Sequence, residues 1–296
     1  MIDPQRLLAD LQGLLPRLEQ DILDFTQADP ARDAALREEY RQAKTAARTA
    51  EHFTDWRAAQ ITQAAAAWVL TCVFVRFLED NRLLDAPYLS GPTDGAELGH
   101  TGGGLAQARD RLTVYFDAHP THAERDYLLW VFESLAPLPA MAELLDRARN
   151  PLWRLPVSAD GAKALIDFFQ RLDPETGAIA HDFSSKTWDT RFLGDLYQDL
   201  SESVRKRYAL LQTPEFVESF ILDYTLTPAL AAFGLPAVRL IDPTCGSGHF
   251  LLTAFQRLFD AWQRREPATN ARALAQRALD AVHGVDINPY AVAIAR

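Results

Sequence analysis

Residues 238–250 read Val-Arg-Leu-Ile-Asp-Pro-Thr-Cys-Gly-Ser-Gly-His-Phe. The apolar run at 238–241 predicts a short buried strand, and Gly246 and Gly248 predict a turn in which glycine takes positive φ. Behind the turn, apolar residues at helical spacing predict an amphipathic helix: Phe250, Leu251, Ala254, Phe255, Leu258, Phe259 and Trp262. Strand, glycine turn and helix in this order are typical of the opening of a doubly wound α/β domain.

The residues that follow predict a second strand and a further helix. A helix is expected over residues 268–281, a strand at Gly284-Val285-Asp286-Ile287, and a helix over residues 290–296 that Asn288-Pro289 caps. The glycine turn places backbone N–H groups beside the N-terminus of a helix, where the positive end of the helix dipole suits an anionic group. Asp242, at the end of the first strand, can face an amine, and Asp286, at the end of the second, can accept hydrogen bonds from ribose hydroxyls.

The spacing of the glycine turn separates three kinds of nucleotide ligand. A dinucleotide favours Gly-x-Gly-x-x-Gly/Ala with an acid about 20 residues further on. Here Leu251 stands at the third glycine position, and Asp286 lies 44 residues beyond Asp242. A phosphate-binding P-loop needs a lysine after its second glycine, and none follows Gly248. An acid for an amine, an amide loop for a carboxylate and an acid for a ribose together favour S-adenosylmethionine.

Upstream, helical periodicity dominates, so the chain is predicted to be mainly α. We expect an all-α domain over residues 1–210 and the truncated start of an α/β Rossmann-like domain over residues 211–296. Asp3 and Pro4 predict the start of a first helix. Its inner face is predicted to comprise Leu7, Leu11, Leu14, Leu18, Ile22 and Phe25. Further helices are predicted over residues 105–118, 122–135, 140–149, 162–172, 192–200 and 202–211, with loops at 90–104 and 173–186.

A long helix from Trp56 to about Leu84, capped by Asp55, is expected at the centre of the helical domain because apolar residues cover most of its circumference. Its charged residues Arg76, Glu79 and Asp80 are expected where the helix reaches the surface.

Thr-Pro-Glu at residues 213–215 predicts another helix start, with Thr213 as the hydroxyl cap. One apolar face of that helix is predicted to comprise Phe216, Val217, Phe220, Ile221 and Tyr224.

Three blocks of sequence resemble the amino-methylating DNA methyltransferases. Residues 242–251 are similar to the first cofactor motif of that family, Asp-Pro-x-Cys-Gly-Ser-Gly-x-Phe. Residues 213–221 resemble the Thr-Pro-x-x-Val-x-x-Phe motif that precedes it, and residues 284–292 resemble the second motif. In this order the blocks indicate an adenine-N6 DNA methyltransferase. The leader segments at 74–84 and 192–198 look most similar to the methyltransferase of phage growth limitation systems.

The resemblance implies S-adenosylmethionine as the cofactor and assigns roles by position. Thr213 would touch the methionine end, Asp242 would bind the amino group, and Asp286 would hold the ribose with Ile287 packed on the adenine. The loop amides of residues 246–248 would lie against the methionyl part, and Cys245 would pack rather than react. The cofactor-binding residues implied are Thr213, Asp242, Pro243, Cys245, Gly246, Ser247, Gly248, Asp286 and Ile287.

The catalytic motif of the family, Asn-Pro-Pro-Tyr/Phe, does not occur in these 296 residues. Asn150-Pro151 lies in the wrong place, and Asn288-Pro289 belongs to the second motif. The chain is therefore expected to be the amino-terminal part of a longer enzyme, with no catalytic residue of its own, inactive alone and binding cofactor weakly. Double-stranded DNA would be held mainly by regions beyond this chain.

Composition bounds the partners and the compartment. Lys+Arg 30 against Asp+Glu 40 gives a net charge of −10, so the chain is not a basic nucleic-acid clamp. Two distant cysteines exclude a disulfide framework, and with no signal peptide they favour the cytoplasm. The apolar stretch at 61–75 is shorter than the roughly 20 residues that a bilayer requires, so a buried helix is expected and no membrane partner. No metal site is predicted.

A different class of function stays open. The chain can be a non-enzymatic helical interaction module with a methyltransferase stub, which recruits other proteins of a defence complex. A reading frame that continues into Asn-Pro-Pro-Tyr/Phe favours the enzyme, and a continuation that lacks this motif but keeps the fold favours a small-molecule methyltransferase. Thr213 is explained equally well as a helix cap alone, and strand-end acids such as Asp286 often only cap loops.

Overall fold

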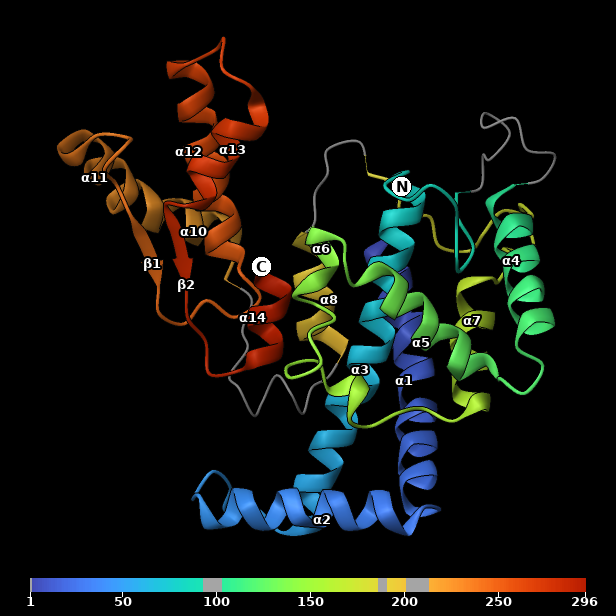
Figure 1. Ribbon diagram of the computed structural model, residues 1–296. Coiled ribbons are helices and arrows are strands. Elements are labelled where there is room, and N and C mark those ends of the chain that lie inside the picture. Colours follow the sequence, from blue (N-terminus) through green and yellow to red (C-terminus); the bar gives the residue numbers. More distant parts are fainter. Residues whose placement is uncertain (1, 93–102, 186–190, 201–212) are drawn as a thin grey trace. The chain divides into compact units, whose positions relative to one another are not determined.

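The computed structural model describes residues 2–92, 103–185, 191–200 and 213–296. The chain is mainly helical, as predicted, and divides into two compact units, Met1–Lys206 and Arg207–Arg296 (Figure 1). The predicted helix at 202–211 lies outside the described residues.

The first unit is built around the long helix α3 (Phe53–Asp80), which packs against α1 (Pro4–Gln27), α7 (Ala159–Phe169) and α8 (Arg191–Leu200). Asp3 caps α1, as predicted: its carboxylate accepts the N–H groups of Gln5 and Arg6, which have no partner within the helix. Leu7, Leu11 and Ile22 on α1 are fully buried. The unit also contains α2 (Pro30–Thr45), α4 (Gly104–Ala118), α5 (Glu124–Leu135), α6 (Pro139–Ala142) and the 3-10 turn η2 (Pro151–Trp153).

Three predicted helices of this unit differ from the structure by three or more residues. The helix predicted over residues 162–172 is α7, which begins and ends three residues earlier. The central helix begins at Phe53, three residues before its predicted start, so that Asp55 lies in the first turn and does not cap it. The helix predicted over residues 140–149 is reduced to α6. There the Asp146 carboxylate accepts the N–H of Ala148, and the Asn150 amide bonds to the carbonyl of Leu144. Such local side-chain bonds compete with the helical ladder and end it.

The charged end of α3 is buried, which corrects the expectation that Arg76, Glu79 and Asp80 reach the surface. Their side chains are 1%, 0% and 2% exposed. The Arg76 guanidinium bonds to Glu79 Oε2 at 3.0 Å and to Asp80 Oδ2 at 2.7 Å. Burial of these charges is tolerated because each is paired and hydrogen-bonded.

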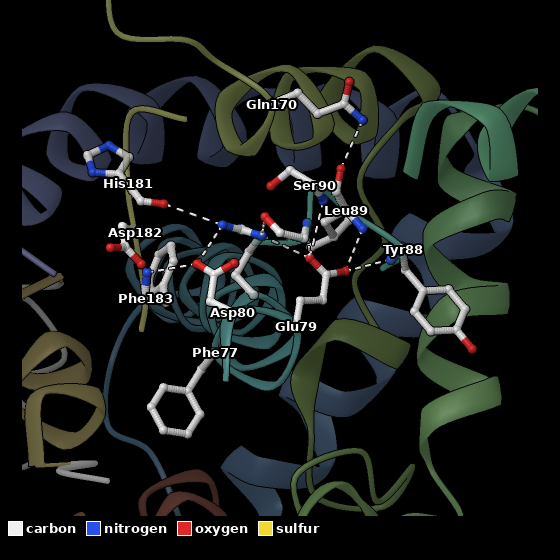
Figure 2. Close-up of polar contacts among 12 residues, drawn as sticks. Phe77, Glu79, Asp80, Tyr88, Leu89, Ser90, Gln170, His181, Asp182 and Phe183 are labelled. Carbon is white, nitrogen blue, oxygen red and sulfur yellow. Dashed lines mark hydrogen bonds and ion pairs between the residues drawn. The ribbon is translucent and has the colours of Figure 1, made fainter. Parts of the chain in front are cut away.

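This buried cluster of Arg76, Glu79 and Asp80 fastens two other segments to α3, one close in sequence and one about a hundred residues away (Figure 2). The Glu79 carboxylate accepts four main-chain N–H groups from residues 88–91. Asp80 Oδ2 accepts the N–H of Phe183 at 2.8 Å. Burial raises the pKa of Asp80 to about 7, although Arg76 and the Phe183 N–H oppose this shift.

The second unit contains a parallel pair of short strands, β1 (Leu240–Asp242) and β2 (Val282–Gly284), joined through α12 (His249–Arg265) and α13 (Ala271–Leu279). Leu240 lies opposite Val282 and Asp242 opposite Gly284. Helix α12 packs against both strands, α13 and α10. The core residues are Leu222, Leu226, Val238, Ala254, Leu258, Trp262, Leu274, Ala278 and Ala281. The unit also holds α10 (Glu215–Tyr224), α11 (Leu226–Phe233) and α14 (Pro289–Ala295).

Helix α10 differs from its prediction in its start and in the face that it buries. Pro214 is its N-cap residue and Thr213 makes no capping bond, so the predicted hydroxyl cap is wrong. The predicted apolar face is turned outward, with Phe216 76% and Tyr224 72% exposed. The buried positions are Glu218 and Leu222. Leu222 joins the apolar core of the unit, and polar contacts to α12 add to this packing.

Within the described ranges of the chain, two helical segments are long and apolar enough to cross a membrane, Phe53–Asp80 and Glu215–Phe233. The first is buried inside the helical unit along most of its length, as expected for a core helix, whereas the second is mostly exposed.

Candidate cofactor-binding site

The candidate site lies where β1 and β2 end, because both strands run in the same direction and finish at one edge. Main-chain pairing continues past the strands: the N–H of Val285 donates to the carbonyl of Asp242 at 2.9 Å, and the N–H of Cys245 donates to that of Val285 at 3.0 Å. The second strand begins at Val282, two residues before its predicted start, and it ends at Gly284. Residues 285–287, which were predicted to be strand, form the turn after β2. The glycine loop, residues 243–248, and this turn lie side by side.

Two residues of the glycine loop take backbone angles that suit glycine. Gly246 has φ of 53°, and Gly248, the N-cap residue of α12, has φ of 95°. A Cβ on Gly248 would lie 2.9 Å from the Cβ of Ala295 in α14. The Gly248 N–H donates to the carbonyl of Cys245 at 2.9 Å, which closes the loop into a tight turn.

Asp286 points at the glycine loop. Its Oδ2 accepts the N–H of Gly246 at 2.9 Å, and its Oδ1 accepts the N–H of Asn288 at 2.8 Å. The carboxylate is partly exposed, and Ile287 beside it is 84% exposed. An exposed aliphatic side chain beside a strand-end acid can pack on a planar ring while the acid accepts hydroxyl hydrogens.

Asp242, the last residue of β1, lies directly before the same loop. Its Oδ1 accepts the N–H of Thr244 at 2.9 Å, and its side chain is half-buried. With the exposed Pro243 it borders a cleft of about 470 Å³ that the inner faces of α10 and α11 complete. Asp242, Pro243, Gly246 and Asp286 are therefore brought to one end of the sheet.

Two other predicted residues are buried within the loop. The Cys245 thiol packs beside Gly284, where an added Cβ would lie 2.9 Å from its sulfur. Burial, with smaller contributions from Asp242 and Asp286, raises the pKa of Cys245 to about 11, so the thiol stays protonated at neutral pH and is a poor nucleophile. Ser247 is 4% exposed, and its hydroxyl lies 3.4 Å from His249 Nδ1.

The structure does not join Thr213 to this group by any hydrogen bond among the described residues. Glu218, a residue that the sequence patterns did not single out, links the same segment to α12, the helix that follows the glycine loop. Glu218 is fully buried on α10, and its Oε2 accepts the hydroxyl hydrogen of Thr253 on α12 at 2.9 Å. Arg257 of α12 adds bonds to Asp223 Oδ1 and to the carbonyl of Ser219. The polar positions of α10, spaced three to five residues apart, were the available signal.

The residues at this end of the sheet fit S-adenosylmethionine in kind. Two carboxylates, Asp242 and Asp286, are available for an ammonium group and for ribose hydroxyls, and Ile287 offers an apolar surface for adenine. A metal centre has no comparable support: no group of three or more His, Cys, Asp or Glu side chains that could hold an ion gathers in the part of the chain that the structure describes.

Comparison with known proteins agrees with this chemistry. Over its whole length the chain is 47% identical to the adenine-specific methyltransferase PglX of Streptomyces coelicolor, in an alignment of 303 residues that covers 24% of that protein. The chain is homologous to a segment of this methyltransferase. The predicted resemblance is thereby confirmed, and the chain spans about a quarter of the length of the curated relative that it matches. No protein-family model and no solved structure matches the chain.

Proposed function

We propose that this chain is the cofactor-binding part of an S-adenosylmethionine-dependent adenine-N6 DNA methyltransferase of a phage-defence system. One observation carries the proposal: the Gly246 N–H and the Asp286 carboxylate, 40 residues apart in sequence, meet at 2.9 Å where two parallel strands end. This places the predicted ribose acid against the predicted glycine loop. The name of the relative supports the adenine-methylating class.

Each residue at the site would have a separate task. Asp286 would accept hydrogen bonds from the ribose, Ile287 would pack against the adenine ring, and Asp242 would face the α-amino group. Gly246 and Gly248 would let the methionyl part approach the main chain closely, because they carry no Cβ. When bound, S-adenosylmethionine supplies an electrophilic methyl group on its sulfonium. The residues of this chain would fix the direction in which that methyl points.

The adenine that accepts the methyl group would be held outside this chain. The Asn-Pro-Pro-Tyr/Phe motif is absent from these 296 residues, and the helical unit carries most of the net negative charge, with 32 acids against 23 bases in residues 1–210. A surface of that sign repels the phosphate backbone. We therefore place the grip on double-stranded DNA, and the extrusion of the target adenine, in the remainder of the longer protein.

Transfer of labelled methyl groups from S-adenosylmethionine to duplex DNA by the full-length protein tests this function. We expect N6-methyladenine in the product and a large loss with Asp286→Ala or Gly246→Val. Asp260→Asn is the matched control, because this partly exposed acid on α12 bonds, within the described part of the chain, to Gln256 one turn away. Full-length protein that methylates no DNA, or that methylates it equally with Asp286→Ala, would contradict the proposal.

A further inference from the structure

The Asp286 carboxylate completes a ladder of hydrogen bonds that begins in the sheet. Beyond the last strand residues, Val285 N–H donates to the Asp242 carbonyl, and Cys245 N–H donates to the Val285 carbonyl. The next amide in line, that of Gly246, donates to Asp286 Oδ2 at 2.9 Å. A side chain thus takes over the role of main-chain partner at Gly246, where φ is 53°.

The carboxylate is itself held in place from the other side. Its Oδ1 accepts the N–H of Asn288 at 2.8 Å. Asn288 is only 2% exposed, and its own Oδ1 caps α14 by accepting the N–H groups of Tyr290 and Ala291. Asp286 therefore connects the glycine loop to a buried helix cap, and its rotamer is restrained at both oxygens.

We propose that Asp286 is a positioning residue, which holds the glycine loop in its binding shape through the Gly246 amide, in addition to any contact with ribose. This rests on the proposed function for its purpose but not for its geometry. An ionised carboxylate has about four acceptor sites on its two oxygens. The bonds from the Gly246 and Asn288 N–H groups use two of them, so ribose hydroxyls can bind without breaking the hold on the loop.

Pre-organisation of this kind lowers the cost of binding, because the loop need not be ordered by the ligand. An alanine variant of Asp286 would have two effects at once. Loss of the carboxylate would loosen residues 244–248 in the protein alone, and it would remove the ribose contact in the complex.

Hydrogen–deuterium exchange of the full-length protein without added cofactor, read over residues 244–248, tests the proposal. We expect exchange there to be roughly 10- to 100-fold faster in Asp286→Ala than in the unmutated protein, the range for loss of a charge-assisted hydrogen bond. Asp286→Asn keeps one acceptor oxygen and should show a smaller increase. Peptides from the buried part of α12 report whether the unit stays folded, and Asp260→Asn should leave both regions unchanged.

Binding of S-adenosylmethionine to the same variants separates this inference from the proposed function. If affinity falls in Asp286→Ala while exchange over residues 244–248 is unchanged, Asp286 acts on the ligand alone and the positioning role is overturned. If exchange rises in that variant but the unmutated protein binds no cofactor, the positioning role stands and the proposed function fails.

Discussion

Gly248 joins the glycine loop to α12, and two separate constraints act on this residue. Its φ of 95° is one that residues with a side chain rarely adopt, and its Cα faces α14 so closely that a Cβ would meet Ala295 at 2.9 Å. Gly234, in the same unit, shares the first constraint but not the second: its φ is 76° and the nearest atom to an added Cβ lies 3.9 Å away. The two glycines therefore allow backbone strain to be separated from crowding.

We predict that Gly248→Ala destabilises the second unit by about 2 to 4 kcal/mol, and that Gly234→Ala, whose cost is backbone strain alone, destabilises it less, by about 1 to 3 kcal/mol. Both variants bear the backbone strain, but only the first pushes α14 away from the loop. Urea unfolding followed by circular dichroism measures the difference. Equal destabilisation by the two substitutions would show that α14 does not pack against the loop as described.

Helix α10 contributes Leu222 to the apolar core and makes polar contacts to α12, while its aromatic residues are exposed. Glu218 is fully buried against Thr253, while Phe220 is 59% exposed. We predict that Glu218→Ala costs about 1 to 3 kcal/mol because it removes a buried charge-assisted bond. Phe220→Ala should change the free energy of unfolding by less than about 0.5 kcal/mol. The same unfolding experiment decides: a larger loss from Phe220→Ala would mean that α10 docks through its aromatic face.

The cluster at the end of α3 makes the stability of the helical unit depend on pH in an unusual direction. The pKa of Asp80 is raised to about 7 by burial, above its value of 3.8 when unfolded. The folded unit therefore binds the proton more tightly, so this contribution to stability is complete below about pH 4 and is lost as the pH rises through 7.

We predict that Asp80→Asn reduces the fall in unfolding free energy between pH 5 and pH 8 by roughly 1 kcal/mol or more. The amide is neutral throughout and can still accept the N–H of Phe183. Asp167→Asn, an exposed acid on α7 paired with Lys163, is the control that should leave the pH profile unchanged. The difference between Asp80→Asn and the unmutated chain isolates Asp80 from other titrating groups. A difference of opposite sign would mean that Asp80 stays ionised when buried, stabilised by Arg76.

Local sequence patterns predicted most of these elements, because apolar spacing and caps act within a few residues. Asp3 with Pro4, and Asn288 with Pro289, marked helix starts that the structure confirms. Long-range partners explain what the patterns missed. Burial of Asp80 depends on Phe183, more than a hundred residues away, and burial of Glu218 depends on Thr253. Within the site, spacing indicated the acid and the loop, but not the bond between Asp286 and Gly246.

At the scale of the whole molecule, a two-stranded parallel sheet is a small base for a ligand site. Three or more strands, or cover on both faces, are ordinarily needed for independent stability. The chain also spans only about a quarter of its methyltransferase relative. We therefore expect the isolated chain to bind S-adenosylmethionine much more weakly than the full-length protein does.

Calorimetric titration of S-adenosylmethionine into the full-length protein tests the central claim most directly, with Asp286→Ala and the control Asp260→Asn beside it. We predict one site per chain, affinity reduced about 10- to 100-fold by Asp286→Ala, the range for a charge-assisted hydrogen bond, and no change with Asp260→Asn. Absence of binding by the unmutated protein, or equal affinity in the Asp286→Ala variant, would contradict a cofactor site at the glycine loop.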